Sequence, residues 1–468
     1  MKRKKYLWIW QIWIILFLQL PVAAQHPDKV LTLADAVNMA SANYLIQSKI
    51  NYVKSSAESV KAAKKDALPD FVLAAQNAYG TLNGVNGLSS GLPGVITLSA
   101  TSSISQNLNA SFGSLYTANL NLNVFSFGLQ RAHVAAAIGQ NYQDQADLDQ
   151  TKFEVQTNVI GLYLNLLTAQ RLRIVMEDNL QRINRLRDII LARTKNGLNP
   201  GVDSSIANAE LSTARISLTD AINYEEGQAS QLSIAIGVRQ QFYILDTSFV
   251  VNIPKNIPAE STLNPRLHPA MRFLYSRIRT SDLIADYIHK TSLPKFSFFA
   301  VGQERGSGFG SSFSSNPKDY STDFLKGIDP VRSNYLLGIG VTWNITDLTR
   351  VKSRVLSQRN LSAAYRDDYN EAETKYIDQS KFADQQISNA LVKYREVPLQ
   401  LKSATDAYNQ KKALYENGLT NIVDVTQTLY MLNTAEAASY IACNSVWQAL
   451  LYKAASVGDI GLFLTQLN

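Results

Sequence analysis

The feature of this sequence that most constrains its fold is an internal duplication. Asn196-Gly197-Leu198 is identical to Asn417-Gly418-Leu419, 221 residues further along the chain. At this offset eight of the nineteen positions from Asn196 to Ala214 are identical. A repeat of such length indicates one structural unit built twice. The chain is therefore divided into a first repeat at residues 25–237, a linker at 238–262 and a second repeat at 263–468.

Each repeat has the same predicted order: a helix, two strands and two further helices. The first repeat predicts helices at 32–65, 129–196 and 203–236, with strands at about 71–80 and 117–126. The second repeat predicts helices at 266–291, 349–416 and 424–457, with strands at about 296–305 and 335–345. A helix of 68 residues is roughly 100 Å long, so the fold class is mainly α with long coiled-coil rods.

Three local features lead to further expectations. Pro398 lies inside the second long helix and removes a backbone hydrogen bond, which predicts a bend or a bulge near Tyr394–Pro398. The linker residues Phe249–Ile253 could form a short strand. The glycine-rich stretch Gly306–Gly310 predicts an exposed loop rather than a phosphate-binding loop, because it does not open a helix.

The predicted strands alternate between apolar side chains and small or polar ones. In the last strand Leu337, Ile339 and Val341 lie on one face, and Gly338 and Gly340 lie on the other. This pattern suits the wall of a membrane β-barrel, but it equally suits a soluble sheet with one face on a core. Four strands cannot close a barrel, and lipid does not tolerate unpaired strand edges. If the strands span a membrane, several chains must share one barrel.

The N-terminus and the composition indicate the compartment. Residues 1–24 combine the basic start Lys2–Lys5 with an apolar run, and small residues precede Gln25, as in a cleaved signal peptide. After residue 25 no run of about 18 apolar residues follows, so we expect no transmembrane helix. Cys443 is the only cysteine, which excludes a disulfide framework, and we expect it to be packed.

Neither an enzyme nor a nucleic-acid-binding protein is indicated. The formal net charge is +7, of which the leader contributes four charges, so the mature chain gains no support for a nucleic-acid partner. Its four histidines have no partner at metal-ligand spacing, and we expect no metal, cofactor or catalytic site. A secreted or periplasmic coiled-coil scaffold or adhesin without a channel remains the alternative to a membrane protein.

Several motifs in this order resemble the TolC family of outer-membrane efflux proteins. They are Leu31–Val37, the Leu-Pro-x-Phe segments Leu68–Phe71 and Leu293–Phe296, Phe125–Gly128, and Tyr415–Val425 followed by Thr428–Tyr430. The resemblance implies a homotrimer with four strands per chain in a shared twelve-stranded outer-membrane barrel, continued by a periplasmic helical tunnel. It also implies that the protein is a passive duct. The implied partners are outer-membrane lipid, a periplasmic adaptor protein, and an inner-membrane transporter of the resistance-nodulation-division or ABC type.

The resemblance also assigns the site residues. It places two helix turns at the periplasmic tip, where an adaptor docks: Asn196, Gly197 and Leu198, and Asn417, Gly418 and Leu419. Asp424 matches an aspartate that narrows the tunnel mouth in the best-known member of the family, and Asp203 is its counterpart in the first repeat. That member has a second acid where this chain has Gln427, so the ring would carry fewer charges. For both aspartates the alternative is a carboxylate that stabilises a helix N-terminus.

Overall fold

The computed structural model describes residues 30–84, 88–92, 95–98, 102–239, 242–255 and 264–467. The predicted signal peptide at 1–24 lies outside this part of the chain. The described chain forms two compact units, and each draws residues from both repeats. Unit 1 comprises Met1–Lys49, Leu148–Met271 and Ala372–Asn468, and unit 2 comprises Ile50–Asp147 and Arg272–Glu371.

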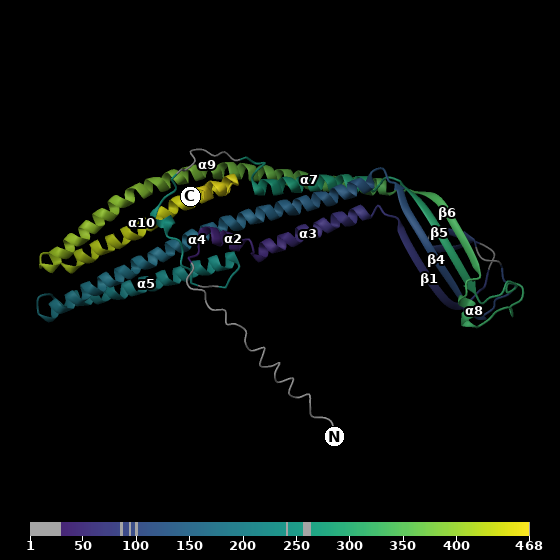
Figure 1. The fold of residues 1–468 in the computed structure, drawn as a ribbon, viewed down its shortest axis with the longest axis horizontal. Coiled ribbons are helices and arrows are strands. Elements are labelled where there is room, and N and C mark those ends of the chain that lie inside the picture. The colour runs from purple at the N-terminus through teal and green to yellow at the C-terminus, as the bar shows by residue number, and fades with distance from the viewer. Residues whose placement is uncertain are drawn as a thin grey trace, which may run out of the picture. The chain divides into compact units, whose positions relative to one another are not determined.

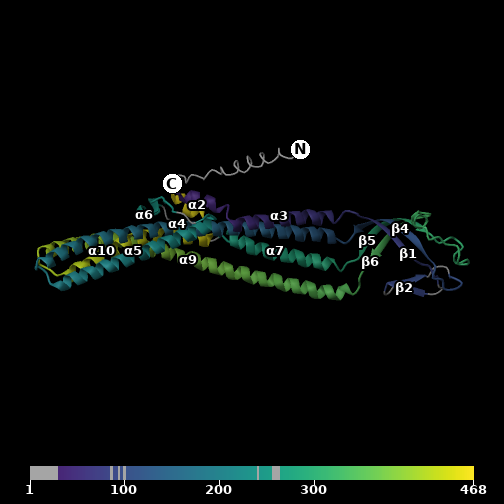
Figure 2. The same cartoon turned by 90° about the horizontal axis from the view of Figure 1, so that it is seen from below.

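Long helices dominate the fold (Figures 1 and 2). The helix that was expected at 32–65 is instead two helices, α2 and α3, separated at Ser41–Asn43. The Asn43 side chain accepts a hydrogen bond from Leu45 N at 2.8 Å and donates one to Ala235 O at 2.7 Å, which fixes this break. These two helices are α2 Leu33–Ala40 and α3 Tyr44–Lys65. The other long helices agree with the expected ranges to within a few residues: α4 Leu129–Lys195, α5 Gly201–Ile236, α7 Pro269–Lys290, α9 Asp347–Glu416 and α10 Ile422–Val457.

Two of the local expectations for the helical part were wrong or only partly tested. Residues Ser248–Val251 form the short helix α6, not a strand, because buried Phe249 packs against the ring of Trp447. Helix α9 continues through Pro398 without a bulge, and the bend stays a prediction. Short helix α11 spans Gly461–Leu464 and the 3₁₀ turn η1 spans Thr465–Leu467 near the C-terminus.

The apolar stripes of the long helices form the core of unit 1. One cluster surrounds Tyr163, whose hydroxyl donates to Leu31 O at 2.9 Å and accepts from Asp246 N at 3.0 Å. Burial raises the pKa of Tyr163 to about 12. Cys443 is packed in the same cluster as expected, and burial raises the pKa of its thiol to about 11. Both groups are therefore neutral structural members of the core.

The strands belong to unit 2 and form a single four-stranded antiparallel sheet in the order β1-β4-β5-β6 (Figure 1). Their bounds are β1 Asp70–Thr81, β4 Ala110–Phe125, β5 Lys295–Ser307 and β6 Arg332–Thr342. A separate hairpin, β2 Leu88–Leu92 with β3 Val95–Leu98, lies between β1 and β4, where the sequence predicted no strand. Strand β4 also begins earlier than expected, because Ala110–Tyr116 pair with β1 despite their loop-like composition.

The strand register sorts the side chains of the sheet onto two faces. Phe71, Leu120, Ala300 and Leu337 lie opposite one another across the four strands, and we call this side the apolar face. The next row, on the other face, contains Asp70, Asn121, Phe299 and Gly338. Phe71, Leu337 and Ile339 are 62%, 62% and 78% exposed. In this chain the apolar face is therefore bare over much of its area, as a lipid-facing wall would be.

The glycine-rich stretch Gly306–Gly310 is not the exposed loop that the sequence predicted. Gly306 lies inside strand β5, one residue before its end at Ser307, and both Gly306 and Gly308 are buried. A Cβ on Gly308 would lie 2.0 Å from Ser111 Oγ and 2.8 Å from Ser321 O. The glycines are thus required because neighbouring chain segments approach the backbone closely.

Candidate functional site

The two duplicated turns in unit 1 join α4 to α5 and α9 to α10 (Figure 2), and they have the same backbone geometry. Gly197 and Gly418 adopt left-handed φ values of 74° and 77°. Leu198 N donates to Arg193 O at 2.9 Å, and Leu419 N donates to Leu414 O at 2.8 Å. Each helix therefore ends in a Schellman motif, in which glycine supplies the left-handed residue without a steric penalty.

Both turns present aliphatic side chains to solvent at corresponding positions. Leu198 and Leu419 are 68% and 72% exposed, and Val202 and Val423 are 61% and 56% exposed. Asn196 and Asn417 are exposed as well. A buried cluster of α4, α5, α9 and α10 side chains, which includes Ile190, Leu211, Tyr415 and Val425, supports the turns from below. We call these two turns the tip of unit 1. The tip therefore rests on a packed apolar cluster and presents two corresponding apolar surfaces, which no other described residues cover.

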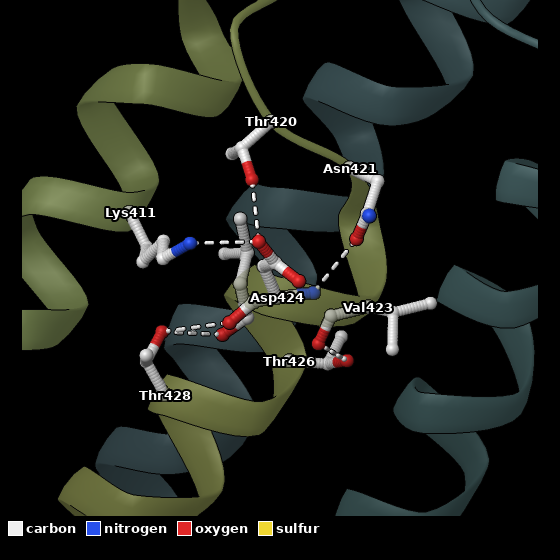
Figure 3. A network of polar contacts seen from close by, with 8 residues as sticks. Lys411, Thr420, Asn421, Val423, Asp424, Thr426 and Thr428 are labelled. Atoms are coloured by element: carbon white, nitrogen blue, oxygen red, sulfur yellow. Dashed lines mark hydrogen bonds and ion pairs between the residues drawn. The ribbon is translucent and has the colours of Figure 1, made fainter.

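Asp424 lies in a polar network at the start of α10 (Figure 3). Its Oδ2 accepts hydrogen bonds from Lys411 Nζ at 2.7 Å and from Thr420 Oγ1 at 2.7 Å. Its backbone N–H donates to the Asn421 side chain at 2.9 Å, so Asn421 caps the helix. The hydrogen bonds from Lys411 and Thr420 hold the pKa of Asp424 below its usual range. Asp424 is thus an ionised carboxylate whose charge is partly balanced by its own chain.

Asp203, the counterpart of Asp424 in the first repeat, has a different environment. Asn199 Nδ2 donates to Asp203 Oδ2 at 2.8 Å and to the Tyr415 hydroxyl at 2.8 Å. Arg193 donates through Nε to Asn199 Oδ1 at 2.9 Å and through Nη1 to Glu416 O at 2.7 Å. These contacts join the turn between α4 and α5 to the end of α9. Burial, reinforced by the charge of Asp203, raises the pKa of the Tyr415 hydroxyl, so it remains protonated.

The structure does not bring all the predicted site residues together. Asp203 and Asp424 contact different partners, and Gln427 is exposed. Lys411, Asn199 and Arg193 were missed by the sequence analysis. Lys411 lies 13 positions before Asp424, and only the antiparallel packing of α9 against α10 places the two side chains in contact.

Other kinds of site find no support among the described residues. In that part of the chain no group of three or more His, Cys, Asp or Glu side chains could hold a metal ion. One helix there, α4, is long and apolar enough to cross a membrane by length and composition alone, contrary to the expectation from apolar runs. Half of its most apolar window is buried against other elements, which is typical of a core helix.

Comparisons with known proteins agree with this architecture. A family model described as "Outer membrane efflux protein" matches residues 38–238 and 306–453, which is most of the chain. No curated protein sequence matches the chain. Among solved structures, the CmeC outer membrane channel of Campylobacter jejuni is similar at a TM-score of 0.75 and 14% identity, covering 91% of this chain and 85% of that one.

Two further structures have the same fold. The outer membrane protein VceC of Vibrio cholerae aligns with a TM-score of 0.69 at 14% identity, over 91% of this chain and 96% of that chain. The open state of the MtrE outer membrane channel of Neisseria gonorrhoeae aligns with a TM-score of 0.62 at 14% identity, over 91% and 89%. The fold is therefore that of an outer-membrane channel with long helices and a strand barrel.

Proposed function

The chain belongs to the outer membrane efflux protein family, and from this premise we propose that it is the passive exit duct of a tripartite efflux or secretion system. The protein is located in the outer membrane and extends into the periplasm. The observation that carries the proposal is the open four-stranded sheet with its exposed apolar face. Edge strands β1 and β6 have no second partner in this sheet, and such edges cannot remain unpaired in lipid.

Three copies of the chain would pair the backbone N–H and C=O groups of these edge strands. Strand β6 of one copy would pair with β1 of the next, which gives a closed barrel of about twelve strands within the size range of such barrels. In this arrangement both repeats, residues 25–237 and 263–468, contribute two strands and a helical hairpin. The scaffold or adhesin alternative would leave Phe71, Leu337 and Ile339 in water, at a cost for each exposed apolar side chain.

The tip is proposed to dock a periplasmic adaptor. The matched exposed pairs Leu198 with Val202 and Leu419 with Val423 offer apolar contacts to the partner's helices. The adaptor would connect the duct to an inner-membrane transporter of the resistance-nodulation-division or ABC type, which would supply the energy. The duct itself would carry out no catalysis and need no cofactor.

The duct is tested by the mass and conductance of the protein extracted from an outer-membrane fraction. We expect a particle of three chains that forms ion-conducting pores in a planar bilayer. A monomeric, water-soluble protein without conductance would refute the duct and favour the scaffold.

Docking is tested separately by co-purification of the duct with a candidate periplasmic adaptor protein expressed in the same cells. Leu198→Asp and Leu419→Asp should each weaken co-purification while conductance is retained. Leu108→Asp is a matched control, because Leu108 is 77% exposed in the segment between β3 and β4 of unit 2, whereas both turns belong to unit 1. Equal co-purification of all three variants would contradict the assignment of the turns.

A further inference from the structure

Helix α8, Phe324–Ile328, lies in the connection between β5 and β6 and is fixed to the sheet at its C-terminus (Figure 1). Its last carbonyl, Ile328 O, accepts hydrogen bonds from Ser114 Oγ at 3.1 Å and from the Tyr116 hydroxyl at 3.2 Å. At its start the Asp323 side chain caps the helix by accepting from Leu325 N at 2.9 Å. This short helix is therefore held by specific bonds, although five residues alone would not form a stable helix.

Two glycines bring the backbone of α8 into direct contact with the strands. A Cβ on Gly327 would lie 2.3 Å from Phe112 Cβ, and one on Gly306 would lie 2.5 Å from both Ser114 Oγ and Asp329 O. No side chain fits at either position without displacing the helix. Gly306 and Gly327 thus allow α8 to pack closely against the strands, because they have no Cβ.

The aromatic contacts identify the face of the sheet that α8 covers. The Phe112 ring lies 4.6 Å from the Tyr79 ring and 5.1 Å from the Phe324 ring, between ring centroids. Phe112 and Tyr79 are separated by even numbers of residues from Leu120 and Phe71, so all four lie on the apolar face. Helix α8 therefore packs on the apolar face.

The exposed side chains of α8 continue the apolar face. Phe324 and Leu325 are 48% and 69% exposed, and Tyr335, on the same face of β6, is 86% exposed. The neighbouring Lys326 and Asp329 are also exposed and polar. Aromatic and aliphatic side chains next to charged ones are typical of the boundary between acyl chains and headgroups.

We propose that α8 is an external anchor that inserts Phe324 and Leu325 into the outer leaflet of the membrane. The helix lies at the end of the sheet opposite to the ends from which α4 and α9 continue. The choice of leaflet rests on the proposed function, in which these long helices extend into the periplasm. The occupant of the surface is the lipid bilayer, because the patch is continuous with the membrane-facing side chains of the strands.

Tryptophan fluorescence in proteoliposomes tests the anchor. The mature chain has two tryptophans: Trp447 is buried, and Trp343 is 49% exposed and lies on the apolar face beyond Val341, near the opposite end of the sheet. In the wild type, quenching of Trp343 by brominated lipid reports that the barrel is inserted. Leu325→Trp in a Trp343→Phe background then reports the position of α8, after subtraction of the signal of buried Trp447 recorded in Trp343→Phe alone.

We expect the tryptophan at position 325 to lose fluorescence with lipids brominated near the headgroup end of the acyl chain, and to lose less with lipids brominated near the chain middle. Ser315→Trp in the same background is the matched control, since Ser315 is exposed in the same β5–β6 connection but outside α8. It should be quenched by aqueous acrylamide and not by brominated lipid.

Quenching of position 325 by acrylamide alone would overturn the anchor, provided that Trp343 is quenched by lipid in the wild type. If wild-type Trp343 also escapes lipid quenching, the barrel is not inserted and the proposed duct itself fails.

Val331→Trp gives a second probe, because Val331 is 57% exposed and follows α8 on the way to β6. It should show the same quenching as position 325, and exclusive quenching by acrylamide would likewise count against the anchor.

Discussion

Lys411 Nζ lies 2.7 Å from Asp424 Oδ2, so the aspartate expected to narrow the tunnel mouth has a counter-charge within its own chain. The two residues belong to α9 and α10, which are joined by the turn at Asn417–Leu419. The Asp424 and Lys411 side chains are 35% and 39% exposed, so solvent also screens their interaction. A ring of Asp424 residues would therefore attract cations less strongly than a ring of unpaired carboxylates.

Substitutions in this pair should change ion selectivity in opposite directions. We expect Asp424→Asn to lower cation selectivity, measured as the reversal potential of reconstituted channels in a salt gradient. Lys411→Gln should raise it, because the carboxylate loses its counter-charge. Gln427→Glu should also raise it if this exposed position lines the opening.

Asp203→Asn is the control in the first repeat, since Asp203 bonds to Asn199 instead of a lysine. Unchanged conductance and selectivity in Asp424→Asn would show that Asp424 does not line the opening and only stabilises the N-terminus of α10.

The selectivity should also depend on pH in a defined way. Hydrogen bonds from Lys411 and Thr420 depress the pKa of Asp424, so its charge persists as the pH falls through 3.8 and is lost only below that value. The stabilisation from this pair is likewise complete above 3.8 and is lost as the pH falls through the depressed pKa. In Lys411→Gln the loss of selectivity should occur at a higher pH. Identical pH profiles for wild type and Lys411→Gln would contradict the assigned cause.

His268 should make the protein less stable in acid. Its ring is 1% exposed, its Nε2 lies 3.2 Å from Ala455 O, and its Nδ1 accepts from Ala270 N at 3.1 Å. Burial lowers its pKa from 6.5, and protonation would abolish the acceptor at Nδ1. Stability should therefore be complete above pH 6.5 and decline as the pH falls toward the lowered pKa, by at most about 1.4 kcal/mol per pH unit and chain.

The measurement is the thermal unfolding midpoint in detergent between pH 8 and pH 5. His268→Gln should flatten this dependence, whereas His289→Gln serves as the control because His289 is exposed. An equally steep dependence in His268→Gln would assign the acid sensitivity to other groups.

Lys453 is a buried ammonium group paired with Asp384. Removal of Lys453 should lower the free energy of unfolding by less than removal of Asp384 does. Its side chain is 3% exposed, and Nζ donates to Asp384 Oδ2 at 2.7 Å, to Ser380 Oγ at 3.0 Å and to Ser380 O at 3.3 Å. Asp384→Ala leaves this charge without its counter-ion and should destabilise the protein by about 2 kcal/mol, since the carboxylate is partly exposed. Lys453→Met should leave the free energy of unfolding, measured with denaturant, nearly unchanged. A larger loss for Lys453→Met would indicate that the ion pair itself is strongly stabilising.

Local rules accounted for much of the fold before the structure was known. A helix was expected to begin at residue 32, and Thr32 caps α2 there, because its hydroxyl accepts from Asp35 N at 3.1 Å. The alternation in β6 placed Leu337 and Ile339 on one face, as the register confirms. These predictions succeeded because capping and alternation depend on residues close together in the sequence. The split between α2 and α3 was missed because Asn43 bonds to Ala235, 192 positions away.

The sequence by itself determined the order of the long helices and of the four sheet strands, the lengths of the rods and the positions of the two turns. A glycine after a long apolar helical stripe can adopt a positive φ and end the helix in such a turn, as Gly197 and Gly418 do. Only the tertiary structure decided which charges are balanced and which surfaces are covered. Lys411 reaches Asp424, and α8 reaches Phe112, through packing of segments whose contacts no short-range pattern encodes. Distances between side chains on different elements depend on this packing. The charge balance at Asp424 and the contact of α8 with the sheet could therefore be determined only from the folded chain.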